Sequence, residues 1–123
     1  MDNNTCPQAS PELSSDTATR HDSEKPDLSY NLLGPEVQVG EARVWVAGAA
    51  KYTRGNWLLG MEYTRAAASL LRHLCQFLAG KNLDVETGLP HVDHIVCCAK
   101  ILAQSYHTRP DLDDRTGHKS IVT

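Results

Sequence analysis

The chain has 123 residues, of which 41% are apolar, and a formal net charge of −3 at pH 7. A chain of this length builds one small domain, and its acidic balance, without a stripe of Lys and Arg, argues against direct nucleic-acid binding. The polar N-terminus lacks the apolar run of a signal peptide, and no segment has the roughly 20 apolar residues that span a bilayer. We therefore expect a cytoplasmic protein without a membrane partner.

The four cysteines form no CxxC pattern and no spacing typical of a zinc cage. Cys97 and Cys98 are adjacent within an apolar stretch that has helical periodicity. Free thiols in such a position commonly behave as small buried hydrophobic groups. We expect these two side chains to lie in the core of a protein from a reducing compartment.

Composition divides the chain into three parts. Residues 1–24 contain almost nothing that can enter a core, so they are predicted to form a disordered polar arm. Residues 25–109 are predicted to form a helical domain that starts with an extended, proline-bounded stretch. Residues 110–123 are rich in Asp and are predicted to be a flexible charged tail or, alternatively, a flap that folds over a site.

Three helices are predicted in the central part. The first should start at Pro35, because proline is favoured just inside a helix start, and run to about Ala47. The second has apolar residues at spacings of three and four and should stop at Gly80, while the third should run from about His91 to His107. The predicted fold is all-α, a small three- to four-helix bundle whose thin core is completed by homo-oligomerisation.

The loop after the first helix contains cationic, aromatic and amide side chains, namely Lys51, Tyr52, Asn56 and Trp57. Cations of this kind bind phosphate, and aromatic rings stack on a planar base. The alternative interpretation is that the aromatic residues anchor the loop to the domain and the cations are solvated.

The second helix also has a polar side. At about 100° per residue, Glu62, Ser69 and His73 lie within roughly 20° of one line, and Arg65 and Arg72 form a parallel line. These groups can serve a site. The alternative is an ordinary solvated face on which Glu62 pairs with Arg65.

The connection to the third helix concentrates ionisable groups: Asp84, Glu86, His91, Asp93 and His94. Carboxylates suit Mg²⁺ or Mn²⁺ in sites that handle nucleotide phosphates, whereas imidazoles suit Zn²⁺, Ni²⁺, Fe²⁺ or, less commonly, Mn²⁺. The mixture does not select a metal. Alternatively, the acidic groups favour the helix dipole and the histidines form hydrogen bonds across the loop.

Four motifs in order resemble the phage dATP/dGTP diphosphohydrolase N-terminal domain family. They are KPDL at residues 25–28, GAAKYTRGNW at 48–57, RHL at 72–74 and GKNLDVETGLPHVDH at 80–94. The resemblance extends to about Leu102. It implies metal-dependent hydrolysis of purine deoxynucleoside triphosphates to monophosphate and pyrophosphate, akin to the activity of MazG-like all-helical enzymes, in the cytoplasm of the host cell.

Positions that match the family suggest the site residues, except Glu62, which comes from the polar line of the second helix; general chemistry suggests the roles. Phosphate and base contacts are assigned to Lys51, Tyr52, Asn56, Trp57 and Arg72; Mg²⁺ or Mn²⁺ ligands to Glu62, Asp84 and Glu86; further ligand or general-base roles to His73, His91 and His94. One departure is Lys81, which stands where the family usually has Glu. One alternative is therefore a non-catalytic phage accessory or nucleotide-binding module on the same scaffold. A second alternative is a zinc protein built on His91 and His94.

Overall fold

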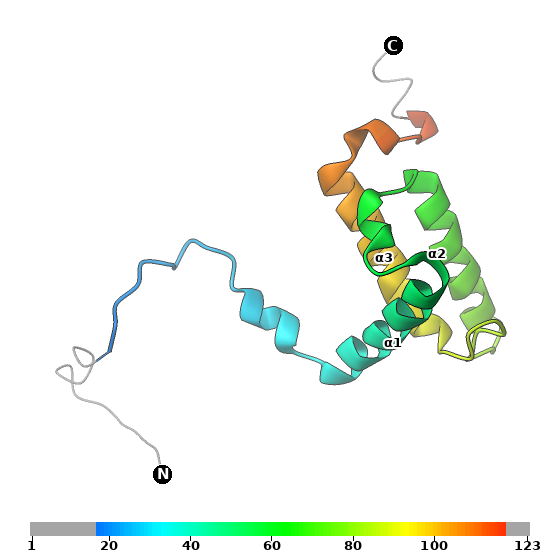
Figure 1. Ribbon diagram of the computed structural model, residues 1–123, viewed down its shortest axis with the longest axis horizontal. Helices are drawn as coiled ribbons and strands as arrows, with labels where there is room; N and C mark the ends of the chain where they lie inside the picture. Colours follow the sequence, from blue (N-terminus) through cyan, green and yellow to red (C-terminus); the bar gives the residue numbers. More distant parts are fainter. Residues whose placement is uncertain (1–16, 118–123) are drawn as a thin grey trace, which may run out of the picture. The chain divides into compact units, whose positions relative to one another are not determined.

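The computed structural model describes residues 17–117, which are largely helical (Figure 1). Three α-helices are present in this part of the chain: α1 (Pro35–Tyr52), α2 (Tyr63–Leu78) and α3 (His91–Thr108). Short 3-10 helices precede, connect and follow them: η2 (Leu28–Leu32), η3 (Asn56–Leu59) and η4 (Pro110–Leu112). The predicted all-α fold is confirmed.

The chain divides into two units, residues 1–30 and 31–123. In the first unit the described residues are exposed, and Asp27 accepts hydrogen bonds from the backbone and hydroxyl of Ser29. The stretch predicted to be extended instead forms the 3-10 helix η2, because this local Asp–Ser contact favours a turn. Most of the predicted disordered arm, residues 1–16, lies outside the described residues.

Helix α1 starts at Pro35 as predicted, after Gly34 in the left-handed conformation (φ 70°). It continues beyond the predicted end at Ala47 to Tyr52, because a single Gly48 among alanines costs only about 1 kcal/mol in a helix. The helix crosses α3 closely at Gly40, where an added Cβ would lie 2.4 Å from the carboxylate of Asp93. A side chain at position 40 would therefore force the Asp93 carboxylate to move.

Helices α2 and α3 form an antiparallel pair (Figure 1). Along the pair, the Tyr63 hydroxyl donates to the Ser105 carbonyl (3.3 Å), and the Cys98 thiol donates to the Ser69 hydroxyl (3.4 Å). Cys97 and Cys98 are buried as predicted, and burial raises the pKa of the Cys97 thiol to about 12. The Cys97 thiol is therefore a neutral packing group.

Residues 110–117 lie against the start of α2. This is the end of the helix pair opposite to the turn that connects α2 and α3. Asp114 accepts a hydrogen bond from the backbone N–H of Thr64 (3.0 Å), and Arg109 donates to the carbonyl of Leu59 (2.7 Å). The Asp114 carboxylate thus satisfies a free donor of the first turn of α2. The rest of the predicted tail or flap, residues 118–123, lies outside the described residues.

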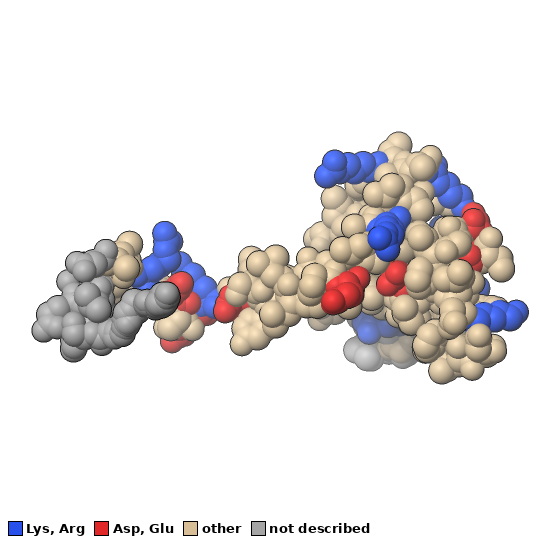
Figure 2. Space-filling view, turned by 90° about the horizontal axis from the view of Figure 1, so that it is seen from below, with Lys and Arg blue, Asp and Glu red and all other residues tan. Residues whose placement is uncertain are grey.

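Charged side chains are dispersed over the surface. In the view of Figure 2, Lys and Arg stand singly and alternate with acidic groups, and no continuous basic area is visible on that face. Among the described residues, no helix is long and apolar enough to cross a membrane.

Candidate metal centre

The connection between α2 and α3 is a closed turn held by backbone hydrogen bonds. Asp84 N–H donates to the Leu89 carbonyl (2.8 Å), Gly88 N–H donates to the Asp84 carbonyl (2.8 Å), and His91 N–H donates to the Asn82 carbonyl (2.8 Å). Gly88 has φ 73°, a conformation that suits glycine. The turn places the side chain of Asp84 beside the first turn of α3.

Three of the predicted site residues converge at this end of the helix pair. His73 of α2, Asp84 of the turn and His91 of α3 each offer one ligand atom, and these atoms lie within 4.8 Å of one another. The Nδ1 atoms of His73 and His91 are 2.9 Å apart. Two nitrogen ligands about 2.1 Å from one ion and at right angles to each other would be about 3.0 Å apart. The donor types and spacing therefore fit one divalent ion.

His94 adjoins this group, one turn along α3. Its ring stacks on that of His73 with centroids 4.4 Å apart and planes 4° apart. Its Nε2 lies 4.0 Å from Asp84 Oδ2 and 2.8 Å from the hydroxyl oxygen of Thr87. We call His73, Asp84, His91 and His94 the histidine cluster.

The protonation states in the histidine cluster favour metal binding. Burial lowers the pKa of His73, and the nearby charge of His94 lowers it further. Burial also lowers the pKa of His94, against the opposing influence of Asp84. Burial by itself would raise the pKa of Asp84, but hydrogen bonds from Thr87 and the adjacent imidazoles lower it overall. At neutral pH the imidazoles of His73 and His94 are thus neutral and the Asp84 carboxylate is ionised, which is the state that binds cations.

Thr87 is a site residue that sequence reasoning missed. Asp84 Oδ2 accepts hydrogen bonds from the Thr87 backbone (2.9 Å) and the Glu86 backbone (3.1 Å), and the Thr87 hydroxyl lies 3.1 Å from the same oxygen. The hydroxyl also accepts from the Leu89 backbone (3.2 Å). Asp followed by Thr three residues later is typical of such turns, so the signal was present in the sequence.

Lys51 and Glu86 are paired with each other. The Lys51 Nζ atom lies 3.1 Å from Glu86 Oε2, and both side chains are more than half exposed. The contact holds the last turn of α1 against the turn that carries Asp84. The ammonium group is also 5.2 Å from the centroid of the Tyr52 ring, which is itself exposed. Glu86 therefore points to a cation and is not among the three converging ligands.

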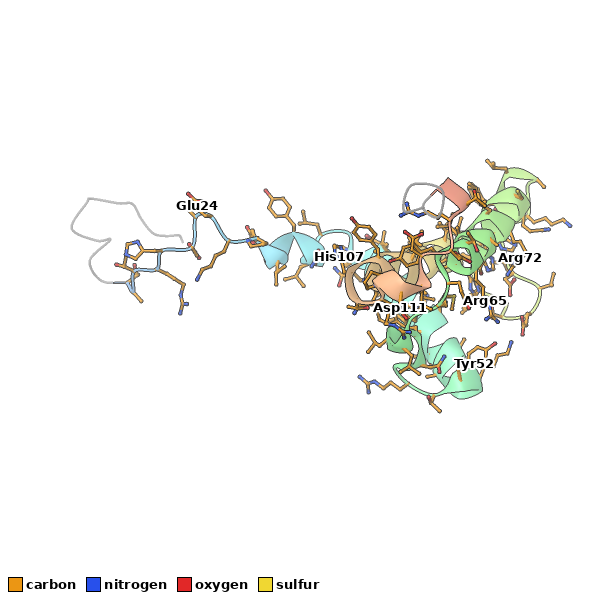
Figure 3. The ribbon with its side chains drawn as sticks, turned by 90° about the horizontal axis from the view of Figure 1, so that it is seen from above. Glu24, Tyr52, Arg65, Arg72, His107 and Asp111 are labelled. Carbon is orange, nitrogen blue, oxygen red and sulfur yellow. The ribbon has the colours of Figure 1, made fainter. Side chains whose placement is uncertain are left out.

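The remaining predicted substrate contacts are distributed over two elements. Trp57 stacks on Trp45 with ring centroids 4.6 Å apart, so one of its faces is already covered. Asn56, the first residue of η3, is exposed. Arg72 is exposed next to His73, and Figure 3 shows it on the same side of α2 as Arg65. Of these residues, Arg72 is adjacent in sequence to a member of the histidine cluster, His73.

Glu62 is not brought together with the other predicted ligands. It precedes the first residue of α2 and lies 3.9 Å from Arg65, the pairing expected for a solvated face. It stands eleven residues before His73, which corresponds to about 16 Å along the helix axis. By contrast, Ser69 and His73 on the same predicted line face α3, through Cys98 and His91.

The fold and the site together define a small all-helical domain with a histidine- and carboxylate-containing cluster that is suited to a divalent cation. The chain belongs to the family described as dATP/dGTP diphosphohydrolase, N-terminal, which it matches over residues 15–115. It is 32% identical over 99 residues to a "dATP/dGTP diphosphohydrolase" of Salmonella phage PMBT28. That match covers 80% of this chain and 33% of the phage protein, so the chain spans about a third of that relative's length. No solved structure matches the chain.

Proposed function

We propose that His73, Asp84 and His91 bind one divalent metal ion. The observation that carries this proposal is the convergence of their ligand atoms within 4.8 Å at the junction of α2, the turn and α3. Two imidazoles with a single carboxylate favour a transition metal such as Mn²⁺ over Mg²⁺, which prefers oxygen ligands. This assignment replaces Glu62 and Glu86 as ligands by the two histidines.

The function that this site supports best is hydrolysis of purine deoxynucleoside triphosphates to monophosphate and pyrophosphate, in phage nucleotide metabolism. The family description and the name of the phage relative support this substrate class. A metal bound there would neutralise phosphate charge and lower the pKa of a water molecule.

The chain supplies four further groups for this chemistry. Lys51, in the last turn of α1, and Arg72, next to His73 in α2, are exposed cations. We assign both side chains to phosphate oxygens. His94, neutral at pH 7 because its pKa is lowered by burial, can accept a proton. Tyr52 is the more accessible aromatic ring for a purine, since Trp45 covers one face of Trp57.

The test is incubation of the purified chain with each of the four deoxynucleoside triphosphates and Mn²⁺, followed by measurement of pyrophosphate. We expect release from dATP or dGTP that is abolished in Asp84→Asn and retained in the control Asp111→Asn. Asp111 is an exposed carboxylate that pairs with Arg109 at the far end of α3. Absence of release from every nucleotide by a folded sample would exclude catalysis by this chain.

The second candidate is a nucleotide-binding module without catalysis. Two points favour it: the chain corresponds to a third of the phage relative, and the sequence has Lys81 where the resemblance to the family leads us to expect glutamate. This candidate predicts that Mn²⁺ and dATP or dGTP bind, as measured by calorimetry, while no pyrophosphate is released.

A further inference from the structure

The apolar stripe of α2 is covered by α3 on one side only: Tyr63 and Ala66 are buried, whereas the other side of the stripe is exposed. The side of α2 that contacts α3 includes the polar Ser69 and His73. At about 100° per residue, Leu71, Leu74 and Leu78 lie at least about 100° around the helix from both of these residues. Leu71 is 54% exposed and Leu78 is 74% exposed. Leu74 is half-buried, so within the described chain this side of α2 is an apolar surface that is only partly covered.

Helix α3 extends this surface. An open hollow of about 420 Å³ lies between the two helices near the start of α2, and its lining is mainly apolar: Ala67, Leu70, Ala99, Leu102, Ala103 and Tyr106, with Tyr63, Thr64, His107 and Arg115 at its edges. The Tyr106 side chain is 61% exposed. We call the hollow together with Leu71, Leu74 and Leu78 the α2–α3 face.

The α2–α3 face has little charge. At about 100° per residue, Arg65 and Arg72 lie at least about 100° around α2 from Leu71, Leu74 and Leu78. Lys100 of α3 is directed to Glu41 of α1, at 2.7 Å. The charged residue that lines the hollow, Arg115, is paired with a neighbouring carboxylate. Two copies of this face can therefore meet without repulsion between like charges.

We propose that the α2–α3 face binds the same face of a second copy of this chain. A two-fold axis that crosses the helix pair places the leucine-rich end of one face over the small-residue hollow of the other, where Ala67 and Ala103 leave room. The contact is thereby self-complementary, as a two-fold interface must be, and the two helix pairs together form a four-helix bundle.

The size of the face is consistent with such a dimer. Helices of 16 and 18 residues are about 24 and 27 Å long, and with a separation of about 10 Å they present roughly 500 Å² in projection. Interdigitating side chains bury more than the projected area, so the face is of the same order as the ~800 Å² per partner of a standard interface. The dimer completes the thin core of the single chain.

The test is sedimentation equilibrium of the full chain from about 1 to 200 μM, with Leu71→Lys and Leu78→Lys as interface variants and Leu58→Lys as a control. Leu58 is 52% exposed, close to the 54% of Leu71, but lies in η3, outside the α2–α3 face. We expect the wild type and the control to have twice the mass of one chain. Each interface variant should dissociate at least tenfold more readily, with unchanged helical content by circular dichroism.

Three results would overturn the proposal. They are a wild-type chain that stays monomeric at 200 μM, interface variants that remain as dimeric as the wild type, and a control that dissociates as readily as the interface variants. The melting temperature provides a second measurement, because a dimer becomes more stable with concentration. A wild-type melting temperature independent of concentration over this range would also count against the dimer.

Discussion

Replacing Asp84 by Asn should separate the two roles of this carboxylate. In the structure its Oδ2 atom accepts from two backbone N–H groups and contacts the Thr87 hydroxyl. An amide oxygen can still accept these bonds, but they lose the strength that a charged acceptor adds. Since a hydrogen bond contributes about 1 kcal/mol, we expect the metal-free variant to lose about 1 kcal/mol of stability, or about 4–8 °C in Tm.

The effect on metal binding should be much larger. A ligand at 100 times its Kd stabilises a folded protein by about 2.7 kcal/mol, which corresponds to an increase of about 11–22 °C in Tm at 4–8 °C per kcal/mol. If the Asp84→Asn variant binds Mn²⁺ 100-fold more weakly, the same concentration stabilises it by only about 0.4 kcal/mol. The Mn²⁺-induced increase in Tm should then fall to about 2–3 °C.

Differential scanning calorimetry of both proteins, with EDTA and with Mn²⁺, measures the two effects separately. The Asp111→Asn control removes a carboxylate charge at the other end of the domain and should keep the full Mn²⁺-induced increase. If the increase in Asp84→Asn equals that of the wild type, Asp84 is not a ligand and the proposed site is wrong.

Three further predictions follow from individual contacts. Thr87→Val removes a hydroxyl that holds the turn and should lower Mn²⁺ affinity by about 10-fold or more, whereas Thr87→Ser should retain wild-type affinity by calorimetry. In metal-free protein the pKa values of His73 and His94 are below the ordinary 6.5. As pH decreases, these histidines therefore bind protons in the unfolded chain before they do so in the folded chain. The free energy of unfolding should then fall as pH decreases below about 6.5. Urea titrations from pH 7.5 to 5 should show this loss, and His94→Gln should reduce it; an unchanged slope would contradict the lowered pKa. Gly40→Ala should destabilise the fold by about 1–3 kcal/mol through collision with Asp93, and adding Asp93→Ala should recover part of that loss, whereas equal stability of wild type and Gly40→Ala would refute the close crossing.

Local signals predicted the helices well because their ends depend on neighbouring residues. The proline at 35 and the glycine at 80 determine where α1 starts and where α2 stops. The C-terminal end of α1 was predicted five residues too early, because the glycine at 48 was interpreted as a helix end. It is instead tolerated inside the helix, since the flanking residues are good helix formers.

The candidate site was predicted in part. Asp84, His91 and His94 are close in sequence, so their proximity depends only on the turn between α2 and α3. The contribution of His73 depends on how α2 rotates against α3, which periodicity did not determine. The contact with α3 includes the polar Ser69 and His73 as well as the buried Tyr63 and Ala66 of the apolar stripe.

Tertiary contacts also decide which candidates are available. Glu86 is close in sequence to Asp84, but a lysine 35 residues earlier pairs with it. One face of Trp57 is covered by Trp45, a residue of α1. Such pairings join residues on different elements, and nothing in the local sequence specifies them.

The most direct test of the central proposal is a crystal structure of the chain grown with Mn²⁺, with diffraction data collected at the manganese absorption edge. We predict an anomalous peak bonded to His73, Asp84 and His91, at about 2.0–2.3 Å from each ligand atom. A well-ordered structure with no anomalous peak at this position, or with manganese bound only elsewhere, would contradict the assignment of the metal centre.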